Sequence, residues 1–169
     1  MDGEPGNYKI EMKKGLILGR FQPLHMGHLS LFEAVIDNQQ ELLVCLGSSN
    51  EERTKRNPYS SSERIQMIKA VLSNYDCKYD IFEIPDINNN DLYVKHLEKI
   101  VPEFDIVYSG NTLVKSLFEE AGHSVIVPKL VNREAWQGVS IRQAMMDGDD
   151  WEMDVPAVVA NIISEIELS

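Results

Sequence analysis

The chain has 169 residues, of which 43% are hydrophobic and 25% are charged. This length fits one domain, with a core large enough to fold without disulfides or a structural metal. The composition excludes collagen-like, coiled-coil and disordered chains. The 27 acidic side chains outnumber the 16 Lys and Arg, which gives a net charge of −11. Such a charge argues against binding of DNA or RNA, because the nucleic-acid phosphates would be repelled on average.

The start of the chain and its cysteines indicate a cellular compartment. Residues 1–14 are polar and lack the apolar stretch of a signal peptide, and no apolar run approaches the roughly 18 residues of a membrane span. Cys45 and Cys77 have neither a CxxC spacing nor a nearby histidine, so we expect two reduced thiols. We therefore expect a cytoplasmic protein that binds no membrane, with an N-terminal extension at 1–14 and one domain at 15–169.

Short apolar runs alternate with amphipathic patterns along the whole chain. The expected elements are, in order, strand 15–19, helix 27–36, strand 41–47, helix 60–72, strand 79–84, helix 91–100, strand 105–109, helix 111–121, strand 124–127, and helices 140–146 and 155–166. A capping box, Ser60 with Glu63, marks the start of the second helix. This alternation predicts an α/β fold, a single-domain, Rossmann-like, doubly wound parallel sheet of about five strands with helices on both faces.

Ligands of such sheets bind beyond the carboxyl ends of the strands. The first of these ends carries Gly19-Arg20-Phe21-Gln22-Pro23-Leu24-His25-Met26-Gly27-His28. Gly27 lets a ligand approach the backbone, and the amino end of the following helix favours an anion. Paired histidines also occur in zinc sites, but no third ligand stands at a matching spacing. The run therefore indicates an anion site, with a metal half-site as the alternative.

This run resembles the HxGH signature of the nucleotidyltransferase superfamily, in the form found in archaeal-type nicotinamide-nucleotide adenylyltransferases. The resemblance covers residues 15–166 and includes, in this order, Gly47-Ser48-Ser49, Asn57-Pro58-Tyr59, Glu63-Arg64, Pro85-Asp86-Ile87, Ser109-Gly110-Asn111 and the helix of Arg142. It implies transfer of the adenylyl group of ATP to nicotinamide mononucleotide (NMN), which gives NAD and pyrophosphate. The NMN phosphate would attack the α-phosphorus of ATP in line.

Adenylyl transfer requires positioning and charge neutralisation, and no nucleophilic residue. The candidate catalytic residues are therefore hydrogen-bond donors and cations: His25, His28, Arg20, Arg56 and Arg142. By resemblance, the two histidines contact the ATP phosphates, and Arg56 binds phosphate from the densest basic cluster of the chain. The further residues expected to bind ATP are Gly19, Phe21, Gln22, Gly27, Ser109, Gly110, Asn111 and Ser140. Ser140 is also predicted to cap the helix that carries Arg142.

The resemblance places the nicotinamide half of the substrate after the third strand. We expect Asp86, Ile87, Asn90 and Tyr93 to bind NMN. The family has Trp at the position of Tyr93, which keeps a smaller stacking face. The asparagines of this segment, and Asn111, are also consistent with turns and helix caps.

The segment around Arg142 departs from the superfamily pattern. Val139 stands where Thr is common, and Gln143 and Ala144 stand where further arginines are frequent. We therefore expect Arg142 to act more nearly alone on the phosphates.

The resemblance also implies the partners of the chain. We expect ATP, NMN and NAD as ligands, Mg²⁺ bound with the roughly four negative charges of ATP, and no metal held by the protein alone. Family members form hexamers or smaller rings, so a homo-oligomer is expected. Two alternatives are a sibling adenylyltransferase that accepts pantetheine phosphate or flavin mononucleotide (FMN), and a nucleotide-binding sensor without catalysis. The segment 86–93 favours NMN as the acceptor.

Overall fold

The structure, a computed structural model, describes residues 12–129 and 136–168. In this part of the chain five strands form one parallel sheet: β1 (Lys14–Gly19), β2 (Glu41–Leu46), β3 (Tyr79–Glu83), β4 (Ile106–Tyr108) and β5 (Ser124–Ile126). Their order is β3-β2-β1-β4-β5, so the direction of winding changes between β1 and β4. Most of the expected extension at 1–14 lies outside the described residues, and Lys14 already belongs to β1.

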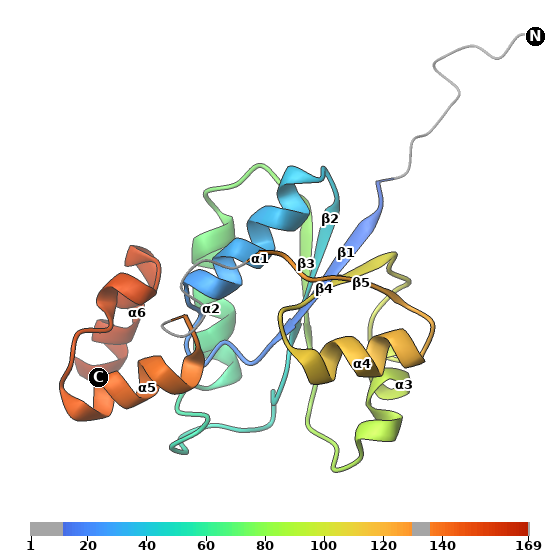
Figure 1. The fold of residues 1–169 in the computed structure, drawn as a ribbon. Helices are drawn as coiled ribbons and strands as arrows, with labels where there is room; N and C mark the ends of the chain where they lie inside the picture. The colour runs from blue at the N-terminus through green and yellow to red at the C-terminus, as the bar shows by residue number, and fades with distance from the viewer. Residues whose placement is uncertain (1–11, 130–135, 169) are drawn as a thin grey trace, which may run out of the picture.

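The helices cover both faces of the sheet, as the alternating pattern predicts (Figure 1). They are α1 (Met26–Asp37), α2 (Ser61–Leu72), α3 (Tyr93–Glu98), α4 (Thr112–Glu120), α5 (Gly138–Asp147) and α6 (Ala157–Leu168). On one face Ile17 and Val44 pack in a core with α1, α2 and α6. On the other face the neighbouring residues Leu16 and Cys45 pack with α3 and α4. Successive strand residues thus point to opposite faces, and the doubly wound fold is confirmed.

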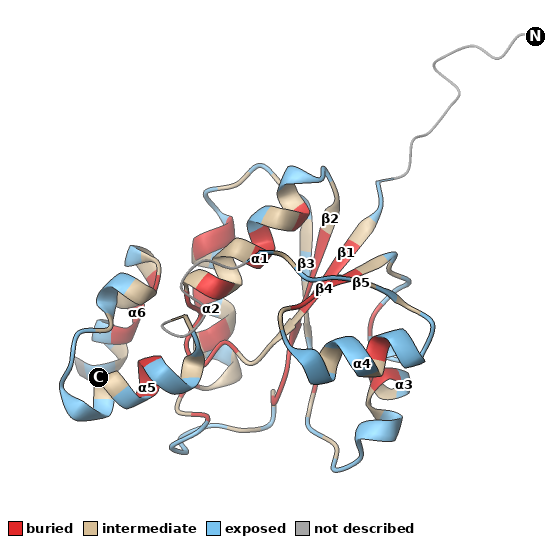
Figure 2. Ribbon diagram, viewed as in Figure 1, coloured by how far each residue is buried: buried red, intermediate tan, exposed pale blue. Residues whose placement is uncertain are grey.

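Burial is greatest in the middle of the sheet (Figure 2). Five of the six residues of β2 are buried, whereas no residue of the edge strand β5 is fully buried. An edge strand has a neighbour on one side only, so its side chains remain accessible. The carboxyl ends of the buried strands β1 and β2 therefore form the rigid base on which a site can be built.

The ends of the helices follow their capping residues. Ser60 Oγ accepts a hydrogen bond from the Glu63 N–H at 3.1 Å, and the Glu63 carboxylate accepts one from the Ser60 N–H at 2.9 Å. The predicted capping box of α2 is therefore confirmed. Asn111 caps α4 by accepting from the N–H groups of Leu113 and Val114.

Two predictions about helices are wrong in detail. The N-cap of α5 is Gln137, and Ser140 lies inside the first turn. A Cβ at Gly138 would lie 2.6 Å from Arg142 Nη1, so this glycine lets the helix start early with the arginine folded against its first turn. The expected helix 91–100 is divided into a 3₁₀ turn, Asn90–Leu92, and the short α3. The Asn89 side chain caps the 3₁₀ turn by accepting from the Asp91 N–H.

None of the described helices is long and apolar enough to cross a membrane.

Candidate active site

Two cavities open at the carboxyl edge of the sheet and share Leu18, Gly19, Arg20 and Asn111. The first cavity, of about 550 Å³, extends toward β2 and β3, and its polar lining includes Ser48, Glu51, Arg56, Asn57, Asp86, Asn90 and Tyr93. The second cavity, of about 570 Å³, extends toward α1 and α5, and its lining includes Phe21, Gln22, His25, Gly27, His28, Ser109, Gly110, Trp136 and Arg142. The residues expected to bind NMN thus line the first cavity and those expected to bind ATP the second, with Arg20 between them. Ile87 and Ser140 are the two exceptions among the predicted residues, since neither lines these cavities.

The two histidines form a capping box of their own at the start of α1. His25 is the N-cap, and its Nδ1 accepts a hydrogen bond from the Gly27 N–H at 3.1 Å. His28 Nδ1 accepts one from the His25 N–H, also at 3.1 Å, and the ring centroids are 3.7 Å apart. A neutral imidazole has one N–H group, so an accepting Nδ1 requires that Nε2 carries the proton. Both rings therefore offer an Nε2–H donor, and a protonated Nε2 disfavours the alternative of a metal half-site.

Burial keeps both histidines neutral. The pKa of His25 is lowered to about 4, first by burial and then by the charge of Arg142. The pKa of His28 is also lowered, by burial first and then by His25 and Arg20. The histidines are therefore neutral donors near pH 7, and the positive charge of the site comes from arginines.

Three arginines converge on the cavities. Burial lowers the pKa of Arg20 and of Arg142, and the charge of Arg56 lowers both further. Arg142 Nη1 donates to the Gln22 carbonyl oxygen at 2.8 Å, which fixes its guanidinium against the turn after β1. Since the three like charges destabilise one another, an anion with several charges bound between them would be strongly favoured.

Two glycines, Gly19 and Gly27, leave room for the histidine rings because they carry no Cβ. A Cβ at Gly19 would lie 3.2 Å from His28 Nε2, and a Cβ at Gly27 would lie 2.8 Å from a carbon of the His25 ring. Such contacts are shorter than real Cβ atoms tolerate without movement. The glycines expected from sequence therefore bring the backbone close to the histidine rings.

Two residues that are predicted to bind ATP, Gln22 and Phe21, have side chains that make contacts within the protein. The Gln22 carboxamide, only 2% exposed, donates to the Tyr59 carbonyl oxygen at 3.0 Å and accepts from the Tyr59 N–H at 2.9 Å. Phe21 is 1% exposed, and its ring centroid lies 4.4 Å from that of His28. These side chains shape the wall of the second cavity, and their direct contact with ATP stays a prediction.

The first cavity combines a polar edge with an apolar wall. Ser48 Oγ donates to Asp86 Oδ1 at 2.9 Å, and the Asp86 N–H donates to Asn50 Oδ1 at 3.0 Å. The ring of Tyr93, apart from its polar hydroxyl, and the α4 side chains Leu113 and Val114 form the apolar wall. A flat ring that carries a carboxamide has the same combination of apolar faces and polar edge.

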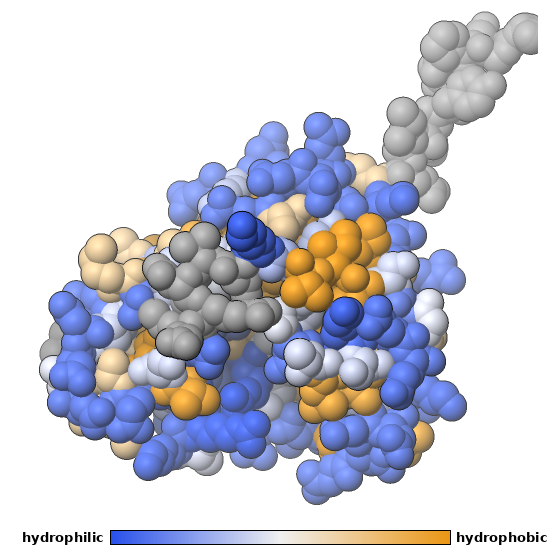
Figure 3. Space-filling view, in the orientation of Figure 1, coloured by the Kyte–Doolittle hydropathy of each residue, from blue (hydrophilic) through white to orange (hydrophobic). Residues whose placement is uncertain are grey.

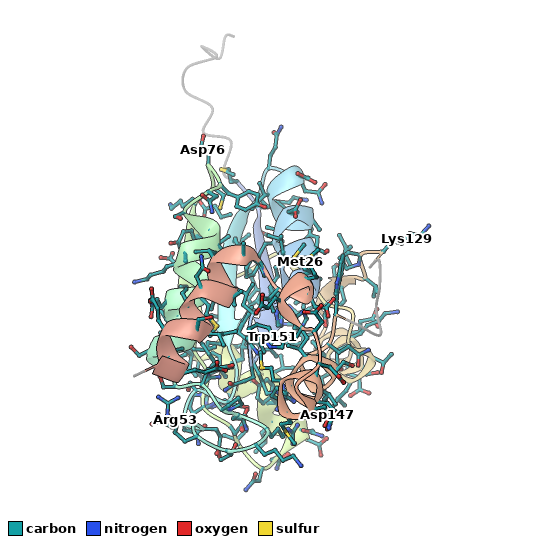
Figure 4. The ribbon with its side chains drawn as sticks, turned by 90° about the vertical axis from the view of Figure 1, so that its left-hand side faces the viewer. Met26, Arg53, Asp76, Lys129, Asp147 and Trp151 are labelled. Atoms are coloured by element: carbon teal, nitrogen blue, oxygen red, sulfur yellow. The ribbon has the colours of Figure 1, made fainter. Side chains whose placement is uncertain are left out.

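The loop that carries Arg56 is tied to the first turn of α2. The Arg53 guanidinium binds both carboxylate oxygens of Glu63, at 2.7 and 2.8 Å, and donates to the Pro58 carbonyl oxygen. Figure 4 places Arg53 at the opposite end of the molecule from Asp76, the end at which the strands terminate. The ties limit the positions that Arg56 can take beside the first cavity.

Several residues of the lining were given no binding role from the sequence, among them Ser48, Glu51, Asn57 and Trp136, although Ser48 and Asn57 lie in motifs that carry the resemblance. Ser48 could have been found, because it follows the carboxyl end of β2, where ligands of parallel sheets bind.

Comparisons with known proteins identify the family of the chain. Residues 16–144 match the family described as cytidylyltransferase-like. A protein of Methanococcus aeolicus named nicotinamide-nucleotide adenylyltransferase is 42% identical over 154 residues, which cover 91% of this chain and 90% of that protein. The chain belongs to the nicotinamide-nucleotide adenylyltransferase family. A family member of Pyrococcus furiosus is 38% identical over 92% of this chain and 85% of its own length.

A solved structure supports the fold of this adenylyltransferase family member. The bifunctional NMN adenylyltransferase/ADP ribose pyrophosphatase from Francisella tularensis matches with a TM-score of 0.70 and 21% sequence identity. The match covers 86% of this chain but 45% of that longer protein. The predictions of the fold class and of the family are thus confirmed, whereas the roles of individual residues remain predictions.

The neutral state of His25 predicts a specific dependence of stability on pH. The unfolded histidine binds a proton as the pH falls through about 6.5, while the folded one does so only near 4, so this stability is present at pH 7 and lost on acidification. His25→Asn keeps an N-cap acceptor but does not titrate. Between pH 7 and pH 5 we expect the free energy of unfolding of the wild type to fall by about 2 kcal/mol more than that of the variant.

Urea denaturation at both pH values, at one protein concentration, measures this difference, since all other titrating groups are common to the two proteins. Equal pH dependence of wild type and His25→Asn would contradict the neutral assignment.

Proposed function

We propose that this chain transfers the adenylyl group of ATP to NMN and releases NAD and pyrophosphate. The observation that carries the proposal is that the two cavities meet at Gly19 and Arg20. NMN in the first cavity and ATP in the second would bring the attacking phosphate and the α-phosphorus together at this shared wall. Binding the two reactants in this geometry supplies much of the rate enhancement.

Each polar group has a defined part in the transfer. An oxygen of the NMN phosphate forms a bond to the α-phosphorus, and the bond from that phosphorus to the pyrophosphate oxygen breaks. We assign the Nε2–H groups of His25 and His28 to the ATP phosphate oxygens, on which negative charge accumulates. Arg20, Arg56 and Arg142 neutralise the substrates and the leaving pyrophosphate.

Magnesium enters this scheme as part of the ATP substrate. The second cavity offers Nε2–H and guanidinium donors, which bind anions and do not ligate a metal. Among the described residues, no group of three or more His, Cys, Asp or Glu is arranged to hold a metal ion. We therefore propose that Mg²⁺ is carried on the ATP phosphates and screens their charge.

We also propose a homo-oligomer in the cytoplasm. Ile126, at the end of the edge strand β5, and the following Val127 are 41% and 45% exposed, and Figure 3 shows a hydrophobic patch over this region of the surface. An exposed sheet edge with apolar side chains is suited to pairing with a second copy. The free thiols of Cys45 and Cys77 are consistent with a reducing compartment.

Light scattering at several concentrations should give a multiple of the chain mass of 19.2 kDa. A mass of 19.2 kDa at every concentration would contradict the oligomer.

The direct test of activity is to incubate the protein with ATP, Mg²⁺ and NMN and to follow NAD by coupled reduction. We expect NAD formation, and a loss of about a hundredfold or more in His28→Ala, because one donor to the developing charge is removed. The control is His123→Ala. His123 lies just before the amino end of β5, whereas the two cavities open at the carboxyl ends of the strands.

The outcomes separate the alternatives. NAD formation that survives in His28→Ala would keep the reaction but contradict the role of His28. No NAD from the wild type, with ATP still bound in calorimetry, would contradict NMN as the acceptor. Pantetheine phosphate and FMN would then be tested as acceptors.

A further inference from the structure

Arg64, near the start of α2, is the largest fully buried side chain in the part of the chain that the structure describes, at 0% exposure. It does not line either cavity, and no role in the reaction follows from the site described above. A buried cation is costly unless its donors are satisfied, so its partners identify what it does.

The guanidinium donates to five backbone carbonyl oxygens. Nε donates to Ser60 at 3.2 Å within α2, and Nη1 donates to Arg20 and Gly47, each at 3.0 Å. Nη2 donates to Ser48 and Glu51, each at 3.1 Å. All five N–H groups of the guanidinium thus have an acceptor, which a lysine with three donors cannot reproduce.

These carbonyl groups lie where the chain leaves β1 and β2. The oxygens of Arg20 and Gly47 belong to the peptide groups that precede Phe21 and Ser48, and these two residues have left-handed backbones with φ of 54° and 49°. Such conformations cost roughly 1 kcal/mol or more in residues other than glycine and persist only where surrounding contacts hold them. Arg64 supplies these contacts to both turns at once.

Both turns carry groups of the site. The first turn begins with Arg20, which lines both cavities, and leads into the histidine pair. The second turn carries Ser48, whose Oγ donates to Asp86 in the first cavity. A change in the distance between the turns would therefore move the ATP side relative to the NMN side.

We infer that Arg64 is a positioning residue for adenylyl transfer, whose guanidinium holds the turns after β1 and β2 in the relative position that in-line attack requires. The inference rests on the proposed function. It assigns Arg64 no contact with either substrate, so the effect of its removal is expected in the reaction step more than in binding.

The first test is Arg64→Lys, which keeps the charge but not the planar set of five donors. In the folded variant, checked by circular dichroism, we expect kcat to fall about tenfold to a hundredfold, because a displacement of about 1 Å has effects of this size. The dissociation constant of ATP in calorimetry should change less than about threefold. The control is Lys69→Arg, the reverse exchange at an exposed position of the same helix that lines neither cavity. Unchanged kcat in Arg64→Lys, or an equal loss in Lys69→Arg, would overturn the inference.

A second test applies if the Arg64→Lys variant does not fold. Arg64→Ala is refolded with and without a low, non-denaturing concentration of guanidinium chloride, with sodium chloride at equal ionic strength as the control. We expect guanidinium, and not sodium, to restore NAD formation at least about fivefold, since the ion can occupy the vacated donor position. No recovery would overturn the inference. If the wild type itself forms no NAD, the proposed function has failed. If the wild type forms NAD and Arg64→Lys does so with the same kcat, the inference about Arg64 alone has failed.

Discussion

The site depends on two hydrogen bonds from the backbone to histidine rings at the start of α1. The Gly27 N–H donates to His25 Nδ1, and the His25 N–H donates to His28 Nδ1. These bonds satisfy donors that every helix start leaves unpaired, so the helix is stabilised by the same groups that we assign to the reaction. They also determine the tautomer, since each ring must keep its proton on Nε2. The capping of one helix thus sets the direction and the charge state of both donors.

In the proposed binding of a polyphosphate, the histidines supply neutral hydrogen-bond donors and the arginines supply positive charge. Burial favours the neutral form of His25 and His28, whereas the guanidinium groups of Arg20 and Arg142 stay charged because their usual pKa is so high. The site therefore concentrates positive charge in a chain with a net charge of −11. A bound polyanion relieves the repulsion among the arginines. This favours binding of ATP and, after the transfer, of pyrophosphate.

Much of this arrangement could be predicted from sequence, because apolar runs and the GRFQPLHMGH segment are local patterns. The alternation of strands and helices predicts the parallel sheet, and the strand-end rule locates the cleft. Ser140 was misplaced as a cap because the space left by Gly138 depends on Arg142, one turn away. The contacts of Arg64 could not be predicted, since its acceptors are backbone carbonyl groups that are up to 44 residues distant and carry no sequence signature.

The central claim, that two neutral histidines present Nε2–H groups to the phosphates, can be tested by nitrogen NMR of the histidine rings. Nitrogen-15 shifts distinguish a protonated ring nitrogen from an unprotonated one and from imidazolium. We predict that His25 and His28 both show protonated Nε2 and unprotonated Nδ1 at pH 7, and still do so at pH 5.5. A proton on Nδ1 of either ring, or an imidazolium at pH 7, would contradict the account of how this site binds and polarises ATP.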